Sequence, residues 1–107
     1  MTERINILRQ FLKDDPNDVF SMYALALEYV KAVELKKALA LMTSLLENHP
    51  DYLPVYYQLG KLHEQVNNKD EALVTYKKGI LLAKEKGNLH TASELRGAID
   101  LLEEDDE

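Results

Sequence analysis

The sequence repeats itself at a spacing of 34 residues. Residues 34 positions apart carry the same or similar side chains at six places: Pro16 and Pro50, Tyr23 and Tyr57, Leu25 and Leu59, Ala26 and Gly60, Ala38 and Ala72, Leu39 and Leu73. A fixed period of about 20 to 50 residues indicates an architecture in which one supersecondary unit is stacked on the next. The period therefore restricts this chain to folds built by repetition.

Each repeating unit contains two segments with helical periodicity. Apolar residues at i, i+3, i+4 and i+7 lie on one face of an α-helix. The first segments have this spacing at Met22, Leu25, Ala26 and Tyr29, and at Tyr56, Leu59, Gly60 and His63. The second segments have it at Ala38, Leu41, Met42 and Leu45, and at Ala72, Thr75, Tyr76 and Gly79.

Two flanking segments show similar apolar stripes. They contain Ile5, Leu8, Phe11 and Leu12, and Leu89, Ala92, Leu95, Ile99 and Leu102. We therefore expect six helices, near residues 3–13, 18–31, 34–48, 53–66, 69–86 and 89–102.

Helix punctuation agrees with this division. The stretches DPND at 15–18 and HPD at 49–51 place a proline and then an Asn or Asp N-cap before the first helix of each unit. Asn68 and Glu71 have the spacing of a capping box, and Gly87 suits a helix C-terminus.

Gly60 is unexpected, because a glycine inside a helix costs roughly 1 kcal/mol relative to alanine. It lies on the apolar stripe of its segment, as Ala26 does one period earlier. Ala38 and Ala72 are the small residues of the second segments. We expect these small residues to face each other and to let paired helices approach closely.

The period and its residue classes resemble the tetratricopeptide repeat (TPR) family. The resemblance rests on the large-x-x-Leu-small-x-x-aromatic run and on the alanine that opens each second helix. It departs where Met22 and Tyr56 replace the family's frequent tryptophan and where Lys84 replaces its proline. It implies an all-α, right-handed solenoid of antiparallel helix pairs.

The length of 107 residues predicts one domain over residues 1–107. We divide that domain into a half repeat (3–18), two repeats (19–52 and 53–86), a capping helix (88–102) and an acidic tail (103–107). The tail has two interpretations, a solvated run that frays the helix end or a binding segment, since negative charge opposes the dipole at a helix C-terminus.

Composition excludes several classes of function. The net charge is −6, but the last five residues are all acidic, so the rest is nearly neutral and lacks the basic stripe that a nucleic-acid interface needs. No long apolar run predicts a membrane span. The absence of cysteine fits a reducing compartment, and we expect a cytoplasmic protein.

Catalytic and metal motifs are incomplete. His63, Glu64 and Asn67 form H-E-x-x-N, in which asparagine replaces the second imidazole ligand of the zinc motif H-E-x-x-H. His63 also occupies the aromatic site of its repeat, so we expect it to be packed or half-buried. We expect no enzyme activity, no cofactor and no metal ion.

A second apolar stripe on the helix near 18–31, formed by Phe20, Tyr23, Leu27 and Val30, suggests a binding surface, because a surface helix needs only one such stripe. In TPR proteins the first helices line a peptide-binding groove. The resemblance places these residues in it: Phe20, Tyr23, Leu27, Lys31, Tyr57, Lys61, Glu64 and Gln65. Thr91 and Leu95 would complete it from the last helix.

Two interpretations of this surface remain open. The first is a noncatalytic adaptor that binds a peptide or protein, with Lys61 available to an acidic ligand group. The second is a structural or scaffold protein that uses the same surface to form homo-oligomers.

Overall fold

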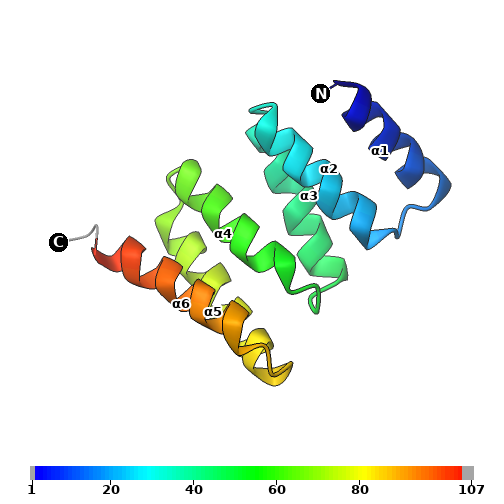
Figure 1. Ribbon diagram of the computed structural model, residues 1–107. Helices are drawn as coiled ribbons and strands as arrows, with labels where there is room; N and C mark the ends of the chain where they lie inside the picture. The colour runs from blue at the N-terminus through cyan, green and yellow to red at the C-terminus, as the bar shows by residue number, and fades with distance from the viewer. Residues whose placement is uncertain (1, 105–107) are drawn as a thin grey trace. The chain divides into compact units, whose positions relative to one another are not determined.

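The computed structural model describes residues 2–104, which form six α-helices and no strand. The helices are α1 (Thr2–Asp14), α2 (Val19–Lys31), α3 (Leu35–Asn48), α4 (Pro54–Gln65), α5 (Lys69–Glu85) and α6 (Leu89–Glu104) (Figure 1). Each predicted helix is confirmed, with ends within two residues of the prediction. Residues 105–107 of the predicted acidic tail lie outside the described residues.

The chain divides after Pro50 into two compact units. In unit 1, α2 packs against both α1 and α3; in unit 2, α5 packs against both α4 and α6 (Figure 1). Short turns join these helices, which makes successive helices neighbours. The single-domain organisation and the repeat boundaries stay predictions.

The predicted apolar stripes form the cores of the two units. In unit 1 the buried apolar side chains are Ile5, Leu8, Met22, Leu25, Ala26, Tyr29, Ala38, Met42 and Leu45. In unit 2 they include Tyr56, Leu59, Leu62, Ala72, Tyr76, Ile80, Leu95, Ile99 and Leu102. Burying each large apolar side chain contributes roughly 1.5–3 kcal/mol, so these stripes supply most of the stabilisation.

Two members of the predicted stripes are exposed instead. Phe11 on α1 is 51% exposed, because α2 is the one helix of unit 1 that packs on α1 and it covers Ile5 and Leu8. Leu89 is 73% exposed at the first position of α6, one turn before the first buried residue of that helix, Ala92. Membership of an apolar stripe therefore does not by itself bury a residue.

The three helices α2, α4 and α5 end in the same way. Each is followed by a residue with positive φ: Val33 (58°), Asn67 (64°) and Gly87 (71°). In each turn the following N–H donates to a carbonyl five residues back, as from Glu34 N to Tyr29 O at 2.9 Å. This is the Schellman arrangement. Gly87 therefore has the predicted role of a helix C-terminus.

The predicted N-caps are correct in one case. The Asp18 carboxylate accepts hydrogen bonds from Ser21 N (3.4 Å) and Ser21 Oγ (2.7 Å). Asp51 is no cap, since α4 begins at Pro54 with Leu53 before it. Proline suits this first position because it has no N–H to satisfy.

The predicted capping box at Asn68 and Glu71 is also absent. Asn68 precedes α5, but its side chain makes no capping hydrogen bond. The Asn68 N–H donates to His63 O at 2.7 Å, as part of the turn that ends α4. The N–H that a capping-box glutamate would bind is therefore already used.

Gly60 makes room for an aromatic ring. A Cβ atom on Gly60 would overlap the ring of Tyr76, which is fully buried. The expectation that Gly60 faces a small residue is thus wrong in detail, since it accommodates one of the largest side chains of the core. Close helix packing in unit 2 still depends on the missing side chain.

Gly79 has a similar role on α5. A Cβ atom there would lie 2.8 Å from Tyr56 Cβ on α4 and 2.9 Å from Leu95 Cδ1 on α6. Both distances are shorter than van der Waals contact allows. The absence of a side chain at this position therefore lets α4 and α6 both approach α5.

Replacing Gly60 with alanine should lower the free energy of unfolding by about 1–3 kcal/mol, because the new methyl group overlaps the Tyr76 ring. Gly97 is the control. It lies inside α6 with nothing within 4 Å of a built Cβ atom, so Gly97→Ala should raise stability by about 0.5–1 kcal/mol. Urea denaturation measures both, and equal effects would contradict the assignment.

Replacing Val33 with asparagine should raise the free energy of unfolding by about 1 kcal/mol. Val33 is 72% exposed and β-branched, and its positive φ is unfavourable for such a side chain, whereas asparagine tolerates it. The reverse change one period later, Asn67→Val, should lower stability by a similar amount. If thermal or urea unfolding places the two changes in the same direction, backbone strain is not the cause.

Candidate functional site

A buried hydroxyl group organises the polar residues at the centre of unit 2. Tyr76 on α5 donates a hydrogen bond from its hydroxyl to Glu64 Oε2 on α4. Lys61 Nζ lies 3.8 Å from the same carboxylate oxygen. Gly60 and Glu64 are one turn apart, so the Tyr76 ring crosses α4 at the glycine and its hydroxyl reaches the carboxylate. Hydrogen bonds to a charged acceptor are stronger than neutral ones.

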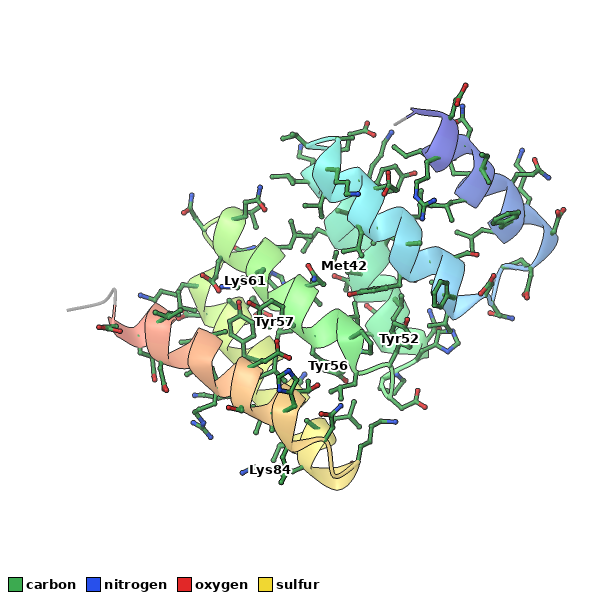
Figure 2. All side chains as sticks on the ribbon, viewed as in Figure 1. Met42, Tyr52, Tyr56, Tyr57, Lys61 and Lys84 are labelled. Atoms are coloured by element: carbon green, nitrogen blue, oxygen red, sulfur yellow. The ribbon has the colours of Figure 1, made fainter. Side chains whose placement is uncertain are left out.

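Tyr57 joins this group through its ring. Lys61 Nζ lies 5.6 Å from the centroid of the Tyr57 ring, and the ring of Tyr76 lies 6.3 Å away at a tilt of 44°. Tyr57 and Lys61 extend from the same helix (Figure 2). The structure thus brings together three predicted site residues, Tyr57, Lys61 and Glu64, while Gln65 is exposed at the end of α4.

A pocket of about 460 Å³ opens beside Tyr57, between the first turns of α4 and α6; we call it the α4/α6 pocket. Its wall on the α4 side is formed by Leu53, Pro54, Tyr57 and Gln58. Its wall on the α6 side is formed by Asn88, Thr91 and Glu94. We expect Thr91 from the sequence to extend the binding surface from the last helix, and in the structure it lines this pocket.

The expectation that Leu95 forms part of the binding surface is wrong. Leu95 is fully buried and packs toward Gly79 on α5. Thr91 and Leu95 are four residues apart, but α6 turns the leucine into the core because the absence of a side chain at Gly79 leaves space there.

In unit 1 the predicted site residues of α2 remain at least partly exposed. Phe20 is 77% exposed, and Tyr23 and Leu27 are half-buried. The core face of the same helix is occupied by Met22, Leu25 and Tyr29. The second apolar stripe predicted from the sequence is thus distinct from the core stripe.

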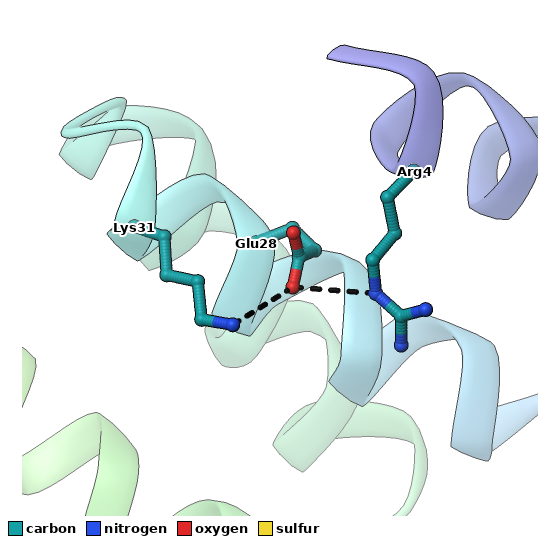
Figure 3. Close-up of polar contacts among 3 residues, drawn as sticks. All are labelled: Arg4, Glu28 and Lys31. Atoms are coloured by element: carbon teal, nitrogen blue, oxygen red, sulfur yellow. Dashed lines mark ion pairs between the residues drawn. The ribbon is translucent and has the colours of Figure 1, made fainter. Parts of the chain in front are cut away.

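Lys31, the fourth predicted site residue of α2, lies in an ionic cluster. Its Nζ is 3.4 Å from Glu28 Oε2, and Arg4 Nε on α1 is 3.4 Å from the same oxygen (Figure 3). The Glu28 side chain is only 8% exposed. A buried carboxylate needs such partners, since removal from water is costly for an unpaired charge.

Sequence reasoning missed several of these groups. Glu28 was not identified as a buried ionic residue, because in the sequence it resembles any polar residue of an amphipathic helix. Gln58, Asn88 and Glu94 belong to no motif, and only the packing of α4 and α6 on α5 brings them together. No local pattern encodes such a contact.

Burial shifts the pKa of three side chains of unit 2, Tyr56, Tyr76 and His63. It raises the pKa of Tyr76, and the hydrogen bond to Glu64 and the Glu64 charge raise it further. It also lowers the pKa of His63, against a smaller opposing effect from Glu71. His63 is half-buried, as predicted, and its Nδ1 atom is buried without a hydrogen-bond partner.

Among residues 2–104, no three histidine or carboxylate side chains are grouped so that they could hold a metal ion. None of the six described helices has the length and apolar character needed to cross a bilayer.

Solved structures resemble this chain closely. The solution structure of a tetratricopeptide repeat domain protein from Salinibacter ruber is 45% identical, with 83% of this chain and 90% of that chain covered and a TM-score of 0.79. A crystal structure of a tetratricopeptide repeat domain protein from the same organism is 44% identical, with 81% and 97% covered and a TM-score of 0.77.

More distant structures share the fold alone. The solution structure of a Bordetella parapertussis protein is 20% identical, with 95% of this chain and 89% of that chain covered and a TM-score of 0.83. The crystal structure of MamA is 21% identical, with 95% and 68% covered and a TM-score of 0.68. No protein-family model and no curated protein matches the chain.

The helix pairs and the identity to the Salinibacter ruber protein together define the class. The chain belongs to the tetratricopeptide repeat family. The predicted resemblance and the all-α helical-repeat fold class are confirmed.

Replacing Tyr76 with phenylalanine should lower the free energy of unfolding by about 1.5–3 kcal/mol at pH 7, because one hydrogen bond to a carboxylate is lost. The pKa of Tyr76 is raised in the folded state, so this phenol stays protonated where the unfolded chain loses its proton. Stability from Tyr76 is therefore present below about pH 10 and decreases above it.

Urea denaturation of the wild type and of Tyr76→Phe at pH 7 and above pH 10 tests this prediction. The phenylalanine variant should show the shallower loss of stability at alkaline pH. Tyr57→Phe leaves the Tyr76 hydrogen bond intact and should change stability by less than about 0.5 kcal/mol. Parallel alkaline curves for wild type and Tyr76→Phe would contradict the assignment.

Proposed function

We propose that this chain is a noncatalytic protein-interaction module that binds a peptide segment of a partner protein. The observation that carries the proposal is the second apolar stripe of α2, formed by Phe20 (77% exposed) with the half-buried Tyr23 and Leu27, on a helix whose core face is already filled by other apolar side chains. A contiguous apolar patch outside the core is typical of an interaction site. Membership of the tetratricopeptide repeat family supports the same conclusion.

The proposed binding residues form two parts, one on each unit, and each part is a separate surface. On unit 1 it consists of Phe20, Tyr23, Leu27 and Lys31 along α2. On unit 2 it consists of Tyr57, Lys61, Glu64 and Gln65 along α4, with the α4/α6 pocket beside them. Tyrosine suits such a surface, since its ring contributes apolar area and its hydroxyl a polar contact.

The contacts within unit 2 modify the role proposed for Lys61. Its ammonium group already lies near Glu64 and above the Tyr57 ring. Lys61 therefore has an ionic partner within the protein and does not need an acidic group of the ligand. We propose that Lys61 and Glu64 act together as a neutral pair that bonds to polar groups of the peptide main chain. An adaptor role in the cytoplasm is part of the proposal, and the lack of cysteine fits that compartment.

Self-association is the second candidate function. It is favoured by three exposed apolar side chains of unit 1, Ile7 (54%), Phe11 (51%) and Phe20 (77%). A second copy that covered them would remove apolar area from water. Light scattering at micromolar concentration distinguishes this candidate, since it requires a dimer or larger oligomer that Phe20→Ala weakens.

Selection from a phage-displayed library of random peptides tests the proposed function. We expect the wild type to enrich peptides with aromatic or aliphatic anchors. Their binding should weaken by about tenfold or more in Phe20→Ala or Tyr57→Ala, because loss of an aromatic contact at an interface commonly costs more than 1 kcal/mol.

Leu81→Ala is the matched control for this selection. Leu81 is 66% exposed on α5 and belongs to neither part of the proposed surface, so its truncation should leave binding unchanged. Failure to enrich any peptide, or equal loss of binding in the control, would overturn the proposed function. Circular dichroism verifies that each variant is folded.

A further inference from the structure

The α4/α6 pocket carries a single charged side chain. Of the residues that line it, Glu94 is the one with a carboxylate side chain, and no lysine or arginine is among them. Glu94 makes an ionic contact on its own helix, where Oε1 lies 3.6 Å from His90 Nε2. Both side chains of this contact are mostly exposed, at 56% and 86%, and such pairs are weak.

The two helix N-termini at the pocket offer little to an anion. Helix N-termini attract negative charge mainly through N–H groups that lack a partner. At α4, Pro54 has no N–H, and the next two N–H groups, of Val55 and Tyr56, donate to Tyr52 O (3.3 Å) and Leu53 O (3.2 Å).

The N-terminus of α6 is similarly occupied. Thr91 N donates to Asn88 Oδ1 at 3.0 Å, and Ala92 N donates to Asn88 O at 3.1 Å. Asn88 thus satisfies two of the first N–H groups of this helix. The remaining electrostatic feature of the pocket is the negative charge of Glu94.

The lysine of α4, Lys61, makes its ionic contact outside the pocket. Lys61 lies one turn beyond Tyr57 and pairs with Glu64, which is itself held by the Tyr76 hydroxyl. It is absent from the pocket lining. Lys61 therefore neutralises Glu64 and leaves Glu94 without a compensating charge on the wall opposite.

We propose that the α4/α6 pocket receives a basic side chain, arginine or lysine, of the bound peptide, with the Glu94 carboxylate as its ionic partner. The side-chain carbonyl of Gln58 is a further acceptor for its N–H groups. Leu53, Pro54 and the Tyr57 ring supply apolar surface against which the methylene stem packs. This inference rests on the proposed function and specifies the ligand of one part of the surface.

A small probe tests the pocket without a complete peptide. Isotopically labelled protein is titrated with N-acetylarginine amide and, separately, with N-acetylcitrulline amide, which has nearly the same shape but no charge. We expect the arginine probe to shift the amide resonances of Gln58, Thr91 and Glu94 and to bind about fivefold more tightly than citrulline, as a partly exposed ion pair allows.

Two variants of α6 isolate the contribution of Glu94. Glu94→Gln should remove the preference for arginine over citrulline. Glu103→Gln makes the same change on the same helix, at a residue outside the pocket lining, and should preserve the preference. Equal binding of the two probes by the wild type, or an arginine preference that survives Glu94→Gln, overturns the inference.

The peptide selection separates this inference from the proposed function. If Tyr57-dependent peptides are enriched and contain arginine or lysine, and Glu94→Gln abolishes that enrichment, both proposals are supported. If such peptides are enriched without basic residues, or with acidic ones, the basic-side-chain inference fails and the interaction module stands. If the arginine probe binds the pocket but no peptide is enriched, the module fails while the charge preference of the pocket remains.

Discussion

The contact between Gly60 and the ring of Tyr76 is the constraint on which the centre of unit 2 depends. The ring occupies the place of a side chain on α4, and this position alone lets its hydroxyl reach Glu64 one turn further along. Glu64 then lies beside Lys61, and Lys61 above Tyr57. A core packing contact thereby determines the arrangement of charged groups on the surface.

A second glycine, Gly79, has the same role for the two helices that form the pocket. Gly79 lets Tyr56 of α4 and Leu95 of α6 approach the same point of α5. Because α5 holds both helices through this point, the first turns of α4 and α6 face each other across a space lined by Tyr57 and Glu94. The helix-propensity cost of two glycines, roughly 1 kcal/mol each, is offset by core packing that any larger residue would prevent.

The sequence predicted the helices well, because a 34-residue period and a 3.6-residue stripe are both visible along the chain without knowledge of which helices pack together. It failed where an outcome depends on what packs nearby. Phe11 and Leu89 continue apolar stripes, yet no helix of their own unit covers them. The capping box at Asn68 failed because the preceding turn had already used the backbone N–H.

The candidate site shows the same limit. The resemblance selected Tyr57, Lys61 and Glu64, which the structure brings together, but the hydrogen bond from Tyr76 joins two helices and leaves no local pattern. Glu94 reaches the pocket only through the packing of α6 on α5. Leu95, on the same helix, was expected on the surface. Its side chain instead packs into the core beside Gly79.

Because Gly60 packs against Tyr76 in one repeat only, single helices cannot be exchanged between the two repeats. One period earlier, the equivalents of Gly60 and Tyr76 are Ala26 and Met42, both fully buried. A recombinant chain that exchanged α2 for α4 without their partner helices would bring an alanine methyl group against a tyrosine ring in one repeat. In the other it would set glycine beside methionine and leave a void. Positions 60 and 76 are therefore matched in size, as positions 26 and 42 are, and a helix can be transplanted only with the helix that packs against it.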